Sequence, residues 1–235
     1  MKKIIAVFLA LGMVTMASGG AIATMMDIET TSKSSVEERH TIFHDAPKIV
    51  GFKGTHYEIG YQAGLKFFDK YLKIREMIWE KAEKDHAPRQ LMEDARNHIK
   101  ILEEVYPQHL EKIKGLSSAI GIGVDELVAL KLFAPIVFPT RCTTSGISSE
   151  ATRDGHNYLT WNLDEGLPFK LGMTHHFKVE STDGYAWVAM GIPVILPMPL
   201  QNERGLSTCA NIVYGQESGD GLTSTELSIK AIVMS

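Results

Sequence analysis

Residues 139–166 read PTRCTTSGISSEATRDGHNYLTWNLDEG, and the interpretation of the whole chain depends on this stretch. It contains Cys142, one of only two cysteines, followed by small and hydroxyl-bearing residues. An Asp-Gly turn signal at 154–155 separates two strand-like runs, which predicts a β-hairpin. The second strand would end at Asn162 and Asp164, bringing an amide and a carboxylate back towards the thiol. These three groups together are typical of a nucleophilic catalytic site.

The two cysteines also permit plainer interpretations. In an exported protein, Cys142 and Cys209 could form a disulfide, which would consume the thiol that a nucleophile needs. Cys209 could instead be a buried structural thiol. If Cys209 and Asn211 belong to one strand, their side chains share a face, because side chains alternate along a strand.

The first 26 residues have the layout of a secretory signal peptide. Lys2 and Lys3 precede an apolar run, and small residues around Ala21 and Ala23 form a cleavage pattern. We expect cleavage after Ala23, with an uncleaved anchor as the alternative. Residues 24–47 are expected to be a flexible lead-in. The protein would then be secreted, periplasmic or at the cell surface, and would meet a membrane only through an uncleaved signal segment.

Composition is that of a globular protein, with 44% hydrophobic and 22% charged residues. The formal net charge of −4 is unlike the basic surface of a nucleic-acid-binding protein, so no nucleic-acid partner is expected. His86, His98 and His109 are predicted to lie on solvated helix faces. The adjacent His175 and His176 would point to opposite sides of a strand. We therefore predict no metal site and no cofactor.

Hydrophobic periodicity changes along the chain, from helical spacing to alternation after Cys142. This order predicts an α+β fold in which helices are layered on a sheet. Gly60 and Gly64 share one helix face, which indicates either close approach of a neighbouring backbone or a frayed helix start. The proline-rich segment 192–200 is expected to be an irregular edge or lid. Helices are expected at 57–79, 88–106, 110–116, from 124 onwards and at 222–235, and strands at 49–52, 143–150, 157–163, 174–180, 185–190 and 206–214.

Several motifs occur in the same order as in a known family, namely GTHYEIGYQAG, VYPQHLEKIKGLS, GVDELVALKLF, RCTTSGIS and WNLDEG. With them, residues 48–235 resemble the acyl-CoA:6-aminopenicillanate acyltransferase-like proteins, which are N-terminal-nucleophile (Ntn) hydrolases. A looser similarity extends to choloylglycine hydrolases, penicillin V acylases and acid ceramidase. The resemblance implies an Ntn-hydrolase αββα sandwich with a helical N-terminal portion.

The resemblance also implies that the precursor is cut between Arg141 and Cys142. Arg141 stands where the penicillin-forming members have a glycine. The new α-amine of Cys142 would act as the base for its own thiol. A segment 48–141 and a segment 142–235 would then form the α and β subunits and stay associated.

Further roles follow from the same resemblance. Asp164 would hold and polarise the new amino terminus, and Asn162 would orient that loop; a turn residue and a strand-end cap are the alternatives. Asn211 would donate to the oxyanion, unless it is a buried turn asparagine. Trp161 stands where the bile-salt-hydrolase branch has an arginine, which argues against that substrate class. It would line an acyl pocket or belong to the core.

These expectations together describe an exported, self-processing cysteine amidohydrolase or acyltransferase that acts on a small N-acyl substrate through an acyl-enzyme. Family members have a longer segment after the nucleophile, with another active-site asparagine. The sandwich is therefore expected to be incomplete at its C-terminal side. The alternative function is a catalytically inactive truncated homologue or a binding subunit.

Overall fold

The structure is a computed structural model that describes residues 48–85, 88–137, 141–164, 175–211 and 221–234. The predicted signal peptide, the lead-in and His86 lie outside the described residues. Among the described helices, none is both long and apolar enough to span a membrane.

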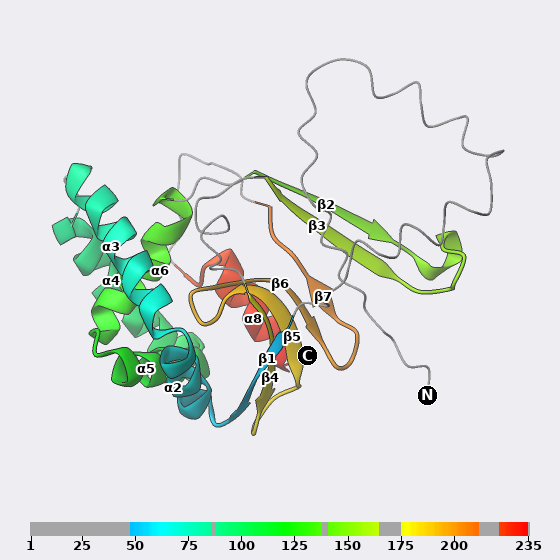
Figure 1. Cartoon of the computed structure of the whole chain (residues 1–235), viewed down its shortest axis with the longest axis horizontal. Helices are drawn as coiled ribbons and strands as arrows, with labels where there is room; N and C mark the ends of the chain where they lie inside the picture. The colour runs from blue at the N-terminus through cyan, green and yellow to red at the C-terminus, as the bar shows by residue number, and fades with distance from the viewer. Residues whose placement is uncertain (1–47, 86–87, 138–140, 165–174, 212–220, 235) are drawn as a thin grey trace, which may run out of the picture. The chain divides into compact units, whose positions relative to one another are not determined.

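The described residues form a mixed α+β fold, as the change in periodicity predicts (Figure 1). Six helices are described: α2 (His56–Lys66), α3 (Phe68–Lys84), α4 (Pro88–Val105), α5 (Pro107–Ile120), α6 (Val124–Val137) and α8 (Ser224–Met234). Seven strands are described: β1 (Ile49–Gly54), β2 (Arg141–Ile147), β3 (Tyr158–Asp164), β4 (His175–Ser181), β5 (Trp187–Ile192), β6 (Leu196–Asn202) and β7 (Ser207–Thr208). A 3₁₀ turn, η2 (Ser149–Ala151), lies between β2 and β3.

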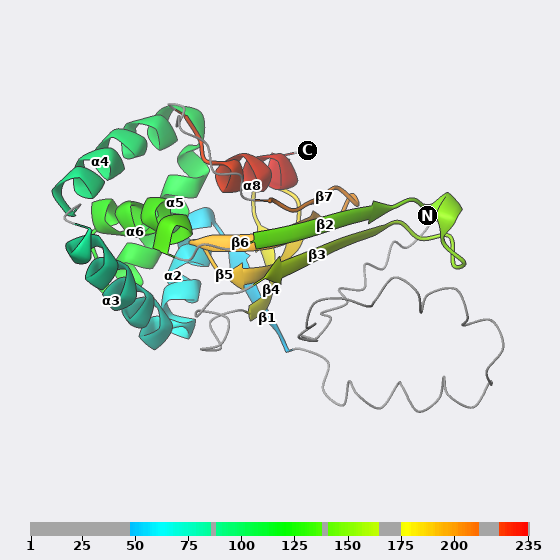
Figure 2. The same ribbon diagram turned by 90° about the horizontal axis from the view of Figure 1, so that it is seen from above.

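The strands form a five-stranded sheet in the order β1-β4-β5-β6-β7 and a separate hairpin of β2 and β3 (Figure 2). β1 pairs with β4 in parallel, with Phe52 opposite Val179, whereas the other pairs in this sheet are antiparallel. The chain before Cys142 therefore contributes a strand to the same sheet as the chain after it.

One face of the large sheet is covered by helices. Phe177 and Val179 of β4 are buried there, and Ile59 of α2 and Ile229 of α8 belong to the same hydrophobic core. The alternate residues of β4 are polar, and Lys178 pairs with Glu180 on the exposed side. This alternation is typical of an antiparallel sheet with one solvated face.

Helices α2 and α5 cross so closely that glycine is required at the contact. A Cβ atom on Gly60 would lie 1.9 Å from the carbonyl oxygen of Lys112, and one on Gly115 would lie 1.9 Å from that of Tyr57. A Cβ on Gly64 would lie 2.5 Å from the Cβ of Ala119. Of the two interpretations of the glycine pair, close backbone approach is therefore confirmed.

Two boundary predictions were wrong, and a third segment is only partly as predicted. The single helix predicted over 57–79 is two helices, interrupted at Phe67, whose buried ring packs 6.3 Å from that of Phe52. Part of the segment predicted to be an irregular edge or lid is the strand β6, whose register with β5 is interrupted between Ala189 and Gly191. Its prolines are tolerated because β7 pairs with β6 only at Leu200 and Gln201, beyond Pro199. In the described part of the strand predicted over 206–214, only Ser207–Thr208 form the strand β7, and residues 212–214 lie outside the described residues.

Candidate functional site

The β2–β3 hairpin brings Asn162 and Asp164 next to the segment that contains Cys142. In the antiparallel register, Thr143 lies opposite Asn162 and Arg141 lies opposite Asp164. Asp164 is therefore across the ladder from the residue that precedes Cys142. The Arg141–Cys142 peptide bond itself lies within β2.

The chain after β7 returns to this hairpin and brings Asn211 with it. The side-chain amide of Asn211 donates to Oγ1 of Thr144 at 3.1 Å. Thr144 is two residues after Cys142, so the two side chains leave the same face of the strand. The indole Nε1 of Trp161 donates to the carbonyl oxygen of Ala210 at 3.1 Å. These two hydrogen bonds hold the 210–211 segment against the hairpin, on the side of Cys142.

Cys209 also lies near Cys142 and Thr144. Burial raises the pKa of its thiol and the neighbouring Cys142 raises it further, while a hydrogen bond with Thr144 acts in the opposite direction. Both cysteines are half-buried free thiols. The disulfide between Cys142 and Cys209 is therefore not formed in this structure. Both thiols lie near Thr144, to which Asn211 also donates.

The other two predicted site residues differ in their surroundings. Asn162 is exposed at its position opposite Thr143. Trp161 is half-buried and packs against the hydrophobic core, as one of its two interpretations predicts.

The prediction that His98 and His109 are solvated was wrong, because both are buried, with 6% and 1% of their surface exposed. They surround Glu226 of α8, which has no exposed surface. His98 Nε2 lies 3.0 Å from both carboxylate oxygens, and Lys131 Nζ donates to Oε1. His109 Nε2 lies 4.0 Å from Oε1. We call these four residues the Glu226 cluster; they come from α4, α5, α6 and α8.

The charges of the Glu226 cluster depend on one another. Burial alone would raise the pKa of Glu226, but the hydrogen bond from His98 and the charge of Lys131 outweigh burial and hold it well below its usual value. Burial lowers the pKa of Lys131, and the carboxylate of Glu226 opposes that change. Burial and the two nearby lysines, Lys131 and Lys112, lower the pKa of His109 well below its usual value, so its imidazole is neutral at pH 7.

One sequence signal for the Glu226 cluster was overlooked. Thr223 and Glu226 have the spacing of a helix capping box. The backbone N–H of Thr223 donates to Oε2 of Glu226 at 2.7 Å, and the backbone N–H of Glu226 donates to Oγ1 of Thr223 at 3.3 Å. The same box at Thr55 and Glu58 begins α2. The spacing predicts the helix start, but not that one carboxylate is buried.

A second buried titratable group lies nearer the large sheet. His56 is buried, and its Nε2 lies 2.8 Å from Oδ1 of the half-exposed Asp183. Burial and the charge of Lys112 lower the pKa of His56, while Asp183 opposes the shift. Lys112 is itself buried, and burial lowers its pKa to about 8.

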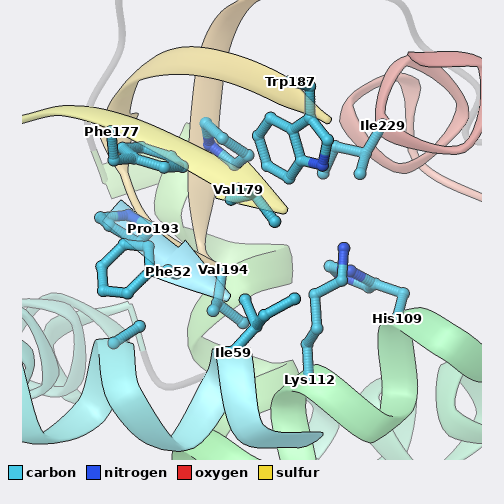
Figure 3. Close-up of a pocket in the computed structure, with 12 residues that line it drawn as sticks. Phe52, Ile59, His109, Lys112, Phe177, Val179, Trp187, Pro193, Val194 and Ile229 are labelled. Atoms are coloured by element: carbon cyan, nitrogen blue, oxygen red, sulfur yellow. The ribbon is translucent and has the colours of Figure 1, made fainter. Parts of the chain in front are cut away.

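Lys112 also lines a cavity between α2, α5, α8 and the sheet (Figure 3). Its walls are mainly apolar, and Cys142 is not among the lining residues. Within the described part of the chain, no group of three or more His, Cys, Asp and Glu side chains is arranged to hold a metal ion.

The chain matches no protein-family model, and no curated protein matches it.

Proposed function

We propose that the protein is a self-processing cysteine amidohydrolase of the Ntn type, acting on small molecules that contain an N-acyl bond. The observation that carries the proposal is the contact between Asn211 and Thr144, because it puts a side-chain amide beside the strand that contains Cys142. The resemblance to the acyltransferase-like family supplies the reaction class. The proposal includes the αββα sandwich of that family, of which the large sheet and the β2–β3 hairpin would be parts.

In the proposed mechanism, hydrolysis of the Arg141–Cys142 bond gives Cys142 a free α-amine. An α-amine has a pKa of about 8, so its neutral form can accept the thiol proton near neutral pH. The thiolate attacks the substrate carbonyl, and the amine product leaves with a proton to give an acyl-enzyme. Water then attacks the thioester, releasing the acid and restoring the thiol. Hydrolysis is favoured over transfer from coenzyme A, because that donor is intracellular and the protein is proposed to be exported.

The neighbouring residues have defined roles in this mechanism. Asn211 donates an N–H to the oxyanion, and Asp164, which lies opposite Arg141 in the register, holds the α-amine. Asn162 orients the end of β3, and Trp161 forms one wall of the acyl site. After the cut, six register pairs between β1 and β4, together with the Glu226 cluster, would keep the two subunits associated.

Intact-mass analysis of the purified mature protein tests the proposal, with Cys142→Ala and Cys209→Ala beside the wild type. We expect the wild type and Cys209→Ala to give two fragments that meet at Arg141–Cys142, and Cys142→Ala to stay in one piece. Each protein is then incubated with N-acyl amides, and a saturable release of amine should require Cys142 but not Cys209. An intact wild-type chain, or cleavage that persists in Cys142→Ala, would contradict self-processing.

A specific observation favours the second candidate, an inactive homologue or binding subunit. Cys142 does not line the cavity shown in Figure 3. In that case the wild type and Cys142→Ala would be equally inactive towards every amide tested and would have the same mass pattern.

A further inference from the structure

The cavity between α2, α5, α8 and the sheet has one polar end. Figure 3 shows Trp187 and Ile229 on one side of this end, with Lys112 and His109 of α5 pointing towards them. The opposite end is closed by apolar side chains, including Phe52 and Phe177. The cavity therefore separates an aromatic and aliphatic region from a group of three nitrogen-containing side chains.

Two of the three nitrogen-containing side chains have no hydrogen-bond partner among the described residues. Within the described residues, Nε1 of Trp187 and both ring nitrogens of His109 are buried without a hydrogen-bond partner. Lys112 Nζ lies 5.5 Å from the centroid of the Trp187 ring, and the side chain is 3% exposed. Buried polar groups in proteins are nearly always satisfied by protein or by ordered water, so three unpaired ring nitrogens beside a buried lysine require an explanation.

We propose that the polar end of this cavity is a binding site for one internal water molecule, held jointly by Lys112, His109 and Trp187. The cavity leaves about 20 Å³ for the centre of a water-sized sphere. One water needs about 10–15 Å³ by the same measure, so one molecule fits and a larger ligand does not.

The hydrogen-bonding capacities of the three groups match those of water. The indole of Trp187 only donates, and the ammonium of Lys112 only donates, so together they fill the two lone pairs of the water oxygen. The imidazole of His109 is neutral, which leaves one ring nitrogen with a lone pair to accept a water hydrogen. Internal waters in proteins make about three such bonds, which is the number available here.

This site would connect two parts of the buried polar interior. His109 belongs to the Glu226 cluster, and the charge of Lys112 acts on His56, which lies beside Asp183. A bound water would join Lys112 to His109 through hydrogen bonds, whereas His109 lies 4.0 Å from Glu226 and Lys112 acts on His56 through its charge. The inference does not depend on the proposed hydrolase activity, because Cys142 and the hairpin take no part in it.

The three tryptophans provide an internal control for the test. The indole N–H of Trp79 donates to Glu126 at 2.6 Å and that of Trp161 donates to Ala210 at 3.1 Å, so only Trp187 needs a water partner. Nuclear Overhauser spectra of the full mature protein, with indole signals assigned by single Trp→Phe variants, should show a cross-peak from a long-lived water to Trp187. No such cross-peak should appear for Trp79. Its absence for Trp187 as well would overturn the proposal.

A second variant separates bound water from proton exchange through the lysine amine. Lys112→Met keeps the length of the side chain but removes its exchanging protons, and leaves Trp187 and His109 as two partners for the water. We expect the Trp187 cross-peak to persist in this variant. Its loss would mean that the amine carried the signal, and would overturn the proposal. A crystal structure of the wild type should show one density peak within hydrogen-bonding distance of both Trp187 Nε1 and a His109 nitrogen. The absence of such a peak would also overturn the proposal.

Discussion

Replacing Glu226 with glutamine should destabilise the protein far more than a change of one atom suggests. Glutamine keeps the length of the side chain and can still accept from the backbone N–H of Thr223. It cannot neutralise Lys131, which is buried and donates to the same carboxylate. The variant therefore leaves a buried ammonium without its counter-charge.

The expected loss is about 3–5 kcal/mol at pH 7, which is typical when one partner of a buried ion pair is removed. Domains of this kind have a total free energy of unfolding of about 5–15 kcal/mol, so the loss is a large fraction of it. With an m-value of about 2 kcal/mol per M in urea, the unfolding midpoint should fall by about 1.5–2.5 M. Urea titration followed by far-UV circular dichroism measures this shift.

Glu58→Gln is the matched control, because Glu58 occupies the same position in the capping box of α2 but is exposed. It should cost less than about 1 kcal/mol, the range of surface charge interactions. Lys131→Met in the Glu226→Gln background should restore part of the loss, since it removes the uncompensated charge. Equal, small effects of Glu226→Gln and Glu58→Gln would refute the conclusion that the Glu226 cluster stabilises the fold.

Three further outcomes follow from the same structure. Because the pKa of Glu226 is depressed in the folded state, its contribution is complete above the unfolded glutamate pKa of about 4.3 and is lost as the pH falls towards the folded value. The urea midpoint of the wild type should therefore fall more steeply below about pH 4.3 than that of Glu226→Gln, and parallel acid profiles would contradict this. Gly60→Ala should lower the free energy of unfolding by about 1–3 kcal/mol in a urea titration, because the new Cβ would lie 1.9 Å from the Lys112 carbonyl oxygen. Gly51→Ala is the control and should be tolerated, because a Cβ there would have no atom within 4 Å. If the proposed hydrolase is active, Asn211→Ala should lower kcat by about 100–1000-fold. Asn157→Ala, which removes the acceptor of a hydrogen bond from the Ser149 N–H in the hairpin loop, should leave kcat within a few-fold. Equal losses in the two variants would count against an oxyanion role for Asn211.

The sequence predicts the hairpin and most elements because their signals are local. The Asp-Gly turn at 154–155 and the alternation on either side of it define β2 and β3 to within three residues. The opposition of Asn162 and Asp164 to the Cys142 segment follows from that turn. The approach of Asn211 to Thr144 is different, because it joins segments 67 positions apart, and no local pattern specifies which residue Asn211 meets.

The burial of His98 and His109 could not be predicted from the helices that carry them. In α4, His98 is followed by Lys100, Glu103 and Glu104, which makes its surroundings appear solvated. Its partner Glu226 is 128 positions away, in the last helix described. A charged residue in a helical pattern is exposed or buried according to whether its counter-charge arrives from another element, and periodicity contains no information about that element.

The position of Glu226 in the chain has a consequence for synthesis. A ribosome produces Lys112 and Lys131 long before it produces α8. Until Glu226 emerges, α6 can pack against its neighbours only by burying the Lys131 ammonium without its carboxylate. The helices made first should therefore stay loosely associated, and hydrogen exchange on stalled nascent chains should show them becoming protected only after residue 226 has left the exit tunnel.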